Sequence, residues 1–115
     1  MLTLDTIVYT NEGKRMTYQY TYDKSIAHYF NKKEAYYVEY DEPISSLPES
    51  INVIPFLANI MPIAWFVGFD VYVNELDETF YQSLQNLKEE FAIHFPQIKT
   101  DTKLHVAKMV ANVLP

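Results

Sequence analysis

The stretch FDVYVNELDETFYQSLQNLKEEFAIHFP, Phe69–Pro96, contains a strand followed by a helix. Its first five residues, 69–73, are mostly apolar and β-branched or aromatic, which favours a strand. Asp77 then supplies a helix N-cap, and Glu78 places negative charge in the first turn, where the helix dipole favours it. Apolar side chains follow three and four positions apart, at Leu76, Phe80, Leu84, Leu87, Phe91 and Phe95. This stripe predicts one long amphipathic helix over residues 77–94, which Pro96 ends.

A second, more apolar helix is predicted just before this stretch, over residues 55–67. Pro55 suits a first helical turn, where its missing N–H costs nothing. Pro62 lies seven residues further on and is expected to kink the helix or to end its first half. Because nearly every position is apolar, we expect protein to surround this helix on most sides. Gly68 is expected to end it.

The N-terminal residues read as a β-hairpin. Residues 6–10 are β-branched and aromatic, and residues 11–13, Asn-Glu-Gly, have turn chemistry. Residues 15–22 alternate strictly, which is typical of a half-buried strand. We expect the face that carries Met16, Tyr18, Tyr20 and Tyr22 to be buried.

Three further segments complete the chain. Residues 23–34 fit either one helical turn, through the spacing of Ile26, Tyr29 and Phe30, or a mobile connector. Residues 35–40 and 103–110 alternate and are predicted to be strands. The fold class expected is therefore α+β: a mainly antiparallel sheet, the long amphipathic helix on one face, and the Pro-kinked helix deeply buried.

Length and composition exclude several classes of function. The chain has 115 residues, enough for one domain over residues 1–115, and a net charge of −6 with nine basic residues, which argues against nucleic-acid binding. It has no cysteine, so disulfides, thiolate metal sites and a cysteine nucleophile are excluded. Its two glycines are too few for a glycine-rich phosphate loop.

Neither a targeting signal nor a membrane span is expected. The first residues lack a basic segment followed by an apolar core, so no signal peptide is visible. The most apolar stretch, residues 53–69, is short for a membrane span and contains Asn59, two prolines and Gly68. We therefore expect a cytoplasmic protein without a membrane partner.

No catalytic residue, metal site or cofactor is expected from the residue pattern. His28, His94 and His105 lack metal-ligand spacing, and Asp77 and Glu78 are explained by helix capping. The serines lack the flanking glycines of a nucleophile elbow. The ten tyrosines could stack on a sugar, but a tyrosine-lined sheet core explains them more simply.

Three residues are unusual for their positions. Asn59 places an amide in an apolar helix, where we expect it to bond the backbone that Pro62 frees. Asp70 interrupts an apolar run at a strand start, which makes it a candidate for contact with a substrate or a neighbouring domain. Trp65 is the single tryptophan of the chain.

Four short segments between residues 47 and 96 resemble a known family. They are Leu47–Ile51, Ile54–Trp65, Phe69–Val71 and Glu75–Tyr81. Together they resemble the N-terminal region of bacterial proteins akin to the ATP-dependent epimerase of a UDP-N-acetylmuramoyl dipeptide, which is similar in turn to PP-loop ATP-pyrophosphatases. That family binds its nucleotide in a glycine- and serine-rich loop beyond such a region, and this chain contains no such loop.

The resemblance implies a non-catalytic N-terminal domain of a larger ATP-using ligase or epimerase-like enzyme. Its partner would be the downstream catalytic domain of the same polypeptide, and Asn59, Trp65 and Asp70 would shape a substrate pocket or an interdomain contact. The apolar C-terminal residues 111–115 fit a chain that continues. A free-standing acidic interaction module is the alternative, a sugar-binding β module is a third possibility, and a homo-oligomer is left open.

Overall fold

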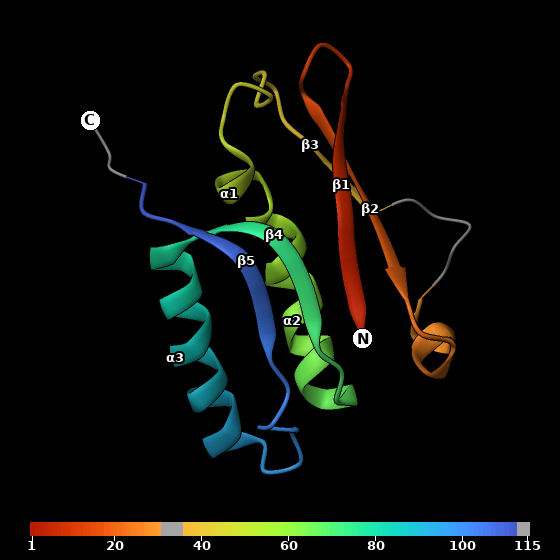
Figure 1. Ribbon diagram of the computed structural model, residues 1–115, viewed down its shortest axis with the longest axis vertical. Helices are drawn as coiled ribbons and strands as arrows, with labels where there is room; N and C mark the ends of the chain where they lie inside the picture. The colour runs from red at the N-terminus through yellow and green to blue at the C-terminus, as the bar shows by residue number, and fades with distance from the viewer. Residues whose placement is uncertain (31–35, 113–115) are drawn as a thin grey trace.

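Five strands form one mixed sheet in the computed structural model, which describes residues 1–30 and 36–112. The strand order is β3-β2-β1-β4-β5 (Figure 1). The strands are β1 (Leu2–Thr10), β2 (Arg15–Tyr22), β3 (Tyr36–Glu39), β4 (Val71–Asp77) and β5 (Leu104–Val110). β1, β2 and β3 pair antiparallel, whereas β4 pairs in parallel with both β1 and β5. The α+β class is confirmed, but the expectation of a mainly antiparallel sheet is wrong.

The helix between β4 and β5 explains this parallel pairing. α3 (Glu78–His94) follows β4 directly. It carries the chain back along the sheet, so that β5 starts beside the start of β4, with Val71 opposite Leu104. Parallel neighbours need such a crossover, and a strand–helix–strand pattern over residues 69–110 is its sequence signature.

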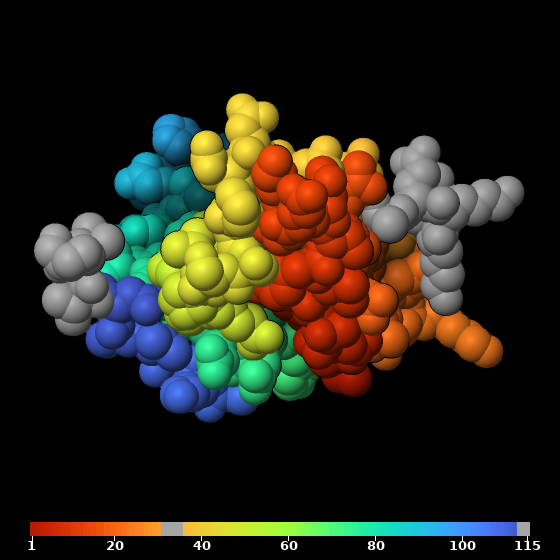
Figure 2. Space-filling view, turned by 90° about the horizontal axis from the view of Figure 1, so that it is seen from above, coloured from red at the N-terminus to blue at the C-terminus, as the bar shows by residue number. Residues whose placement is uncertain are grey.

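The hairpin is longer than predicted, and its turn is tightly packed. β1 begins at Leu2, and Asn11, Glu12 and Gly13 all have positive φ, at 53°, 58° and 82°. A Cβ on Gly13 would lie 2.4 Å from the Ser45 hydroxyl oxygen, so glycine lets the loop after β3, which contains Ser45, approach the hairpin turn closely. The Ile44 N–H donates to the Gly13 carbonyl at 2.8 Å, and Figure 2 shows the loop against the hairpin tip.

The segment after the hairpin forms a 3₁₀ helix, η1 (Lys24–Tyr29). The helical-turn alternative is therefore confirmed for these residues. The rest of the possible connector, residues 31–34, and residue 35, the first of the predicted third strand, lie outside the described residues.

Two helices lie between β3 and β4: α1 (Glu49–Asn52) and α2 (Ile54–Val67). Pro55 stands in the first turn of α2, and Pro62 lies inside a helix that continues to Val67, so Pro62 does not end it. A kink at Pro62 stays a prediction. Gly68 ends α2 with a φ of 97°, in the left-handed region that glycine adopts without strain.

α2 and α3 pack side by side and cover one face of the sheet. Trp65 of α2 meets Phe91 of α3 edge to face at 5.3 Å, and Phe56 stacks on Tyr18 of β2 at 5.2 Å. Met16 and Tyr18 are buried and Tyr20 and Tyr22 half-buried, so the predicted inner face of β2 is confirmed. The other face carries exposed residues such as Thr21 and Tyr72.

α2 is less enclosed than its composition predicts. Ala58, Asn59, Ile63 and Phe66 are exposed, and the opposite side of the helix faces the core. A fold with one layer of helices on one face of a sheet leaves each helix a solvent side, so the expectation that protein surrounds this helix on most sides is not confirmed. In residues 1–30 and 36–112, no helix combines the length and apolarity needed to cross a bilayer.

Candidate functional site

Trp65 lies in the core rather than at a binding surface. Its side chain is 1% exposed and packs against Phe91. Its carbonyl accepts the Lys99 N–H at 2.7 Å, which ties the loop before β5 to α2. A substrate cannot reach this ring, so its place in the fold is to support the contact between α2 and α3.

Asn59 is exposed on the outer side of α2. Its side-chain amide donates to the Tyr36 hydroxyl at 2.6 Å and to the Pro55 carbonyl at 3.0 Å. Pro62 leaves the carbonyl of residue 58, four positions before it, without its helical N–H donor. Asn59 bonds the Pro55 carbonyl and not that of residue 58, so the predicted partner is wrong. It joins the helix to β3.

Asp70 lies immediately before β4, and its carboxylate bonds to the start of β5. One carboxylate oxygen lies 2.9 Å from Nε2 of His105, and the other accepts the Lys103 N–H at 3.0 Å. The hydrogen bond with His105, followed by that from Lys103, lowers the pKa of Asp70. No hydrogen bond, ion pair or ring contact joins any two of Asn59, Trp65 and Asp70 in the part of the chain that the structure describes.

His105 also stacks on Tyr72, which is its partner in the neighbouring strand. The ring centroids are 4.3 Å apart, and the ring planes are nearly parallel, with an angle of 8° between them. An Asp–His pair can orient an imidazole for proton transfer. Here it stands at the amino-terminal ends of β4 and β5, whereas open parallel sheets bind ligands at the carboxyl ends. We therefore interpret Asp70 and His105 as a clamp that fixes the starts of the two strands.

At the carboxyl end of β4, the polar side chains bond to one another. Asp77 caps α3 by accepting the Phe80 N–H at 2.9 Å, as the sequence predicts. The Asn112 amide donates to Asp77 at 2.8 Å and to the Ser50 hydroxyl at 3.1 Å. The bond from Asn112 lowers the pKa of Asp77. Among the described residues, no group of three or more histidines, aspartates and glutamates could hold a metal ion.

The exposed tyrosine rings already have partners on the open face of the sheet. The Arg15 guanidinium lies over the Tyr37 ring at 4.5 Å, and Tyr72 stacks on His105. A sugar would have to displace these contacts to stack on the same faces. The open face also carries polar side chains such as Gln19 and Thr21, together with the exposed Ala107 and Met109.

An exposed apolar cluster lies where α2 and α3 meet. We call it the α2–α3 patch, and it consists of Ile63, Phe66, Leu87, Phe91 and Phe95. Ile63, Phe66, Leu87 and Phe95 are 38%, 40%, 44% and 40% exposed. Phe66 joins the two helices, because its ring lies 5.6 Å from Phe95 and 6.4 Å from Phe91.

Residue spacing makes the patch continuous. Ile63 and Phe66 are three apart on α2, and Leu87, Phe91 and Phe95 are four apart at the end of α3, so each row lies on one side of its helix. The predicted stripe of α3 contains all three of these α3 residues, but the sequence could not show that the stripe extends beyond the core. α2 carries no ionisable side chain, so nothing charged interrupts the patch from that side.

No protein-family model matches the chain, and no curated protein or solved structure matches it.

Proposed function

We propose that this chain is a non-catalytic docking domain of a larger ATP-using enzyme of the ligase or epimerase type. The α2–α3 patch is the observation that supports this function. It places two phenylalanines, an isoleucine and a leucine at the surface of one helical layer, each about two-fifths exposed. Contiguous exposed apolar side chains of this kind mark protein interaction sites. The catalytic domain of the same polypeptide would cover them.

Two of the three candidate residues then lie at or beneath the patch, and the third holds the sheet together. Trp65 packs beneath the patch against Phe91, and Asn59 lies one turn before Ile63, at the rim of the patch. Asp70 holds β4 against β5 through His105, away from the patch. None of the three touches a substrate in this scheme, and the interdomain role is preferred over a substrate-shaping role.

A free-standing acidic interaction module is the second candidate, because the same patch would serve a separate partner protein. The reading frame past Pro115 separates the two. A glycine-rich phosphate loop encoded downstream supports the domain of a larger enzyme. A stop codon, or a continuation without such a loop, contradicts it and leaves the separate module.

Docking is tested by placing charge in the patch. In the double variant Ile63→Glu, Leu87→Glu, both side chains are well exposed, so we expect the isolated chain to keep its fold and lose no more than about 1 kcal/mol of unfolding free energy. In the full-length gene product, we expect ATP-dependent turnover to fall about tenfold or more, because a buried unpaired carboxylate opposes docking.

The matched control puts the same charges on the open face of the sheet. Thr10 and Thr21 are exposed on β1 and β2, and a Thr10→Glu, Thr21→Glu variant should keep both fold and turnover. Equal turnover in the patch variant and in this control would refute the docking function of the patch.

A further inference from the structure

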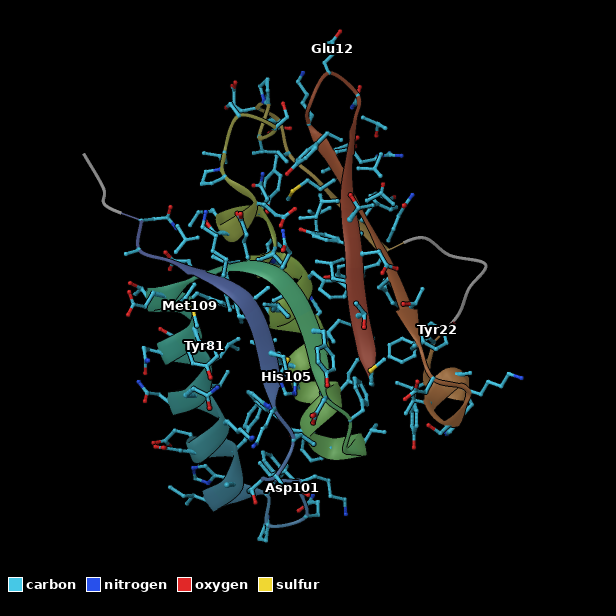
Figure 3. The ribbon with its side chains drawn as sticks, in the orientation of Figure 1. Glu12, Tyr22, Tyr81, Asp101, His105 and Met109 are labelled. Atoms are coloured by element: carbon cyan, nitrogen blue, oxygen red, sulfur yellow. The ribbon has the colours of Figure 1, made fainter. Side chains whose placement is uncertain are left out.

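β5 is one of the two edges of the sheet. It pairs with β4 over its full length, from Leu104 opposite Val71 to Val110 opposite Asp77. Within residues 1–30 and 36–112, no strand pairs with its outer side. Figure 3 shows β5 with His105 and Met109 along it, and α3 beside it.

The register shows which backbone groups of β5 point away from the sheet. The Val71 N–H donates to the Lys103 carbonyl at 3.1 Å, so residue 103 faces β4. In a parallel ladder, alternate residues direct both N–H and C=O to the same neighbour. Residues 105, 107 and 109 therefore face β4, and Leu104, Val106, Lys108 and Val110 direct their N–H and C=O groups outward.

In the part of the chain that the structure describes, a hydrogen bond occupies a main-chain group on the outward side just before β5 begins. The Lys88 ammonium of α3 donates to the Thr102 carbonyl, which is on the outward side by the same alternation. Among the hydrogen bonds of the described residues, none engages the outward N–H or C=O groups of Val106 or Lys108. An unprotected edge of this kind can pair with another extended chain.

The residues of β5 themselves carry positive charge, while the neighbouring strand β4 places Glu75 opposite Lys108. Residues 102–112 contain two lysines and no acidic residue, although the whole chain has a net charge of −6. Both Lys103 and Lys108 are exposed. The edge is thus locally basic and fits an acidic strand.

We propose that the outer edge of β5 binds an extended acidic peptide segment of a partner protein, which adds to the sheet as a sixth strand. The main-chain groups of Val106 and Lys108 hydrogen-bond to the peptide, and Lys103 and Lys108 select acidic side chains. A second copy that pairs through its own β5 is disfavoured, because two such edges would bring lysines of like charge together. This surface is separate from the α2–α3 patch and does not depend on it.

The probe is a fluorescein-labelled nine-residue peptide that alternates valine and glutamate, titrated with the full chain and followed by fluorescence anisotropy. A matched peptide that alternates valine and lysine tests charge selection. The glutamates of an alternating peptide share one face, and Lys103 and Lys108 lie on opposite faces, so the peptide pairs with one of the two lysines. At up to about 1 kcal/mol, that pair favours the glutamate peptide by up to about fivefold. Equal binding of both peptides, or none by either, would overturn the proposal.

Proline substitutions distinguish loss of peptide pairing at the outer edge from loss of the pairing between β5 and β4. Lys108→Pro removes an N–H that faces outward, so the fold should be kept while peptide binding is lost. Lys108→Thr removes the charge but keeps the N–H, and should weaken binding only in part. Met109→Pro removes an N–H that faces β4, and should lower the melting temperature.

Amide exchange in the unaltered chain gives a readout that needs no variant to fold. On binding of the glutamate peptide, we expect exchange to slow at Val106 and Lys108 and to stay unchanged at Ala107 and Met109. Slowing at the odd-numbered residues alone would refute the edge geometry. Concentration-dependent oligomers of the unaltered chain that Lys108→Pro abolishes would assign the edge to a second copy and would also overturn the proposal.

Discussion

Asn52 is the most highly connected buried polar residue in the described structure. It is 3% exposed, and its side-chain amide donates to the Tyr9 hydroxyl at 2.9 Å and to the Ile44 and Leu47 carbonyls, both at 3.1 Å. Its own carbonyl accepts the Tyr18 hydroxyl at 2.6 Å. One side chain thus joins the end of α1 to the hairpin and to the loop after β3.

Asn52→Ala should therefore lower the free energy of unfolding by about 1–3 kcal/mol, because it leaves two carbonyls without their donor in a buried site. Urea denaturation followed by Trp65 fluorescence measures the change. Asn86→Ala, at an exposed position of α3, should stay within about 0.5 kcal/mol of the unaltered chain. Similar losses in the two variants would show that the Asn52 bonds do not stabilise the fold.

Asp70 makes stability depend on pH. Its pKa is lowered in the folded chain by the bonds with His105 and Lys103, so its stabilising contribution is complete above the pKa of the unfolded chain and is lost as pH falls through the lower, folded value. Asp70→Asn should reduce the loss of stability between about pH 5 and about pH 2. It should not abolish that loss, since the pKa values of Glu39 and Asp77 are lowered too. The free energy of unfolding is measured by urea denaturation at several pH values. An equal loss of unfolding free energy in the unaltered chain and in Asp70→Asn would contradict the role assigned to Asp70.

Single residues could be predicted from sequence only where their partners are close along the chain. The Asp77 cap was predictable, because its acceptor position and the Phe80 N–H are three residues apart. The contact between Asp70 and His105 was not, because 35 residues separate them and only the parallel register of β4 and β5 brings them together. The bonds of Asn52 with Tyr9 and Tyr18 depend on the same kind of long-range placement.

Among the elements, α3 shows what a stripe of apolar residues leaves undecided. The stripe predicts the helix and its apolar side, but it does not distinguish Leu84 from Leu87. The structure buries Leu84, which is 4% exposed, and leaves Leu87 at 44%. One side of the stripe faces the sheet, and the other side forms part of the α2–α3 patch.

Leu84→Ala should therefore cost about 2–5 kcal/mol of unfolding free energy in the isolated chain, the usual cost of a cavity in a core. Leu87→Ala should cost less than about 1 kcal/mol there. Both are the same substitution in the same helix, so propensity cancels, and thermal or urea denaturation gives the comparison. Equal costs would show that Leu87 belongs to the core of this chain and not to a docking surface.

Taken as a whole, the molecule has one layer of helices on one face of a mixed sheet, and its two candidate interaction surfaces differ in chemistry. The α2–α3 patch is apolar, whereas the outer edge of β5 offers main-chain N–H and C=O groups flanked by two lysines. The sequence predicted most of the elements, because periodicity and capping are local. It did not predict the strand order or the exposure of Ile63 and Phe66, because both depend on which layers the fold provides.

Side-chain footprinting with hydroxyl radicals measures directly whether the α2–α3 patch is covered, and it needs no substitution. It is carried out on the purified chain and on the native protein inside its own cells. If the patch is a docking surface, Phe66, Leu87 and Phe95 are modified readily in the purified chain and are protected in the cell, while Tyr37 on the open face of the sheet reacts alike in both. Equal modification of Phe66, Leu87 and Phe95 in the two settings would show that the patch is not a docking surface.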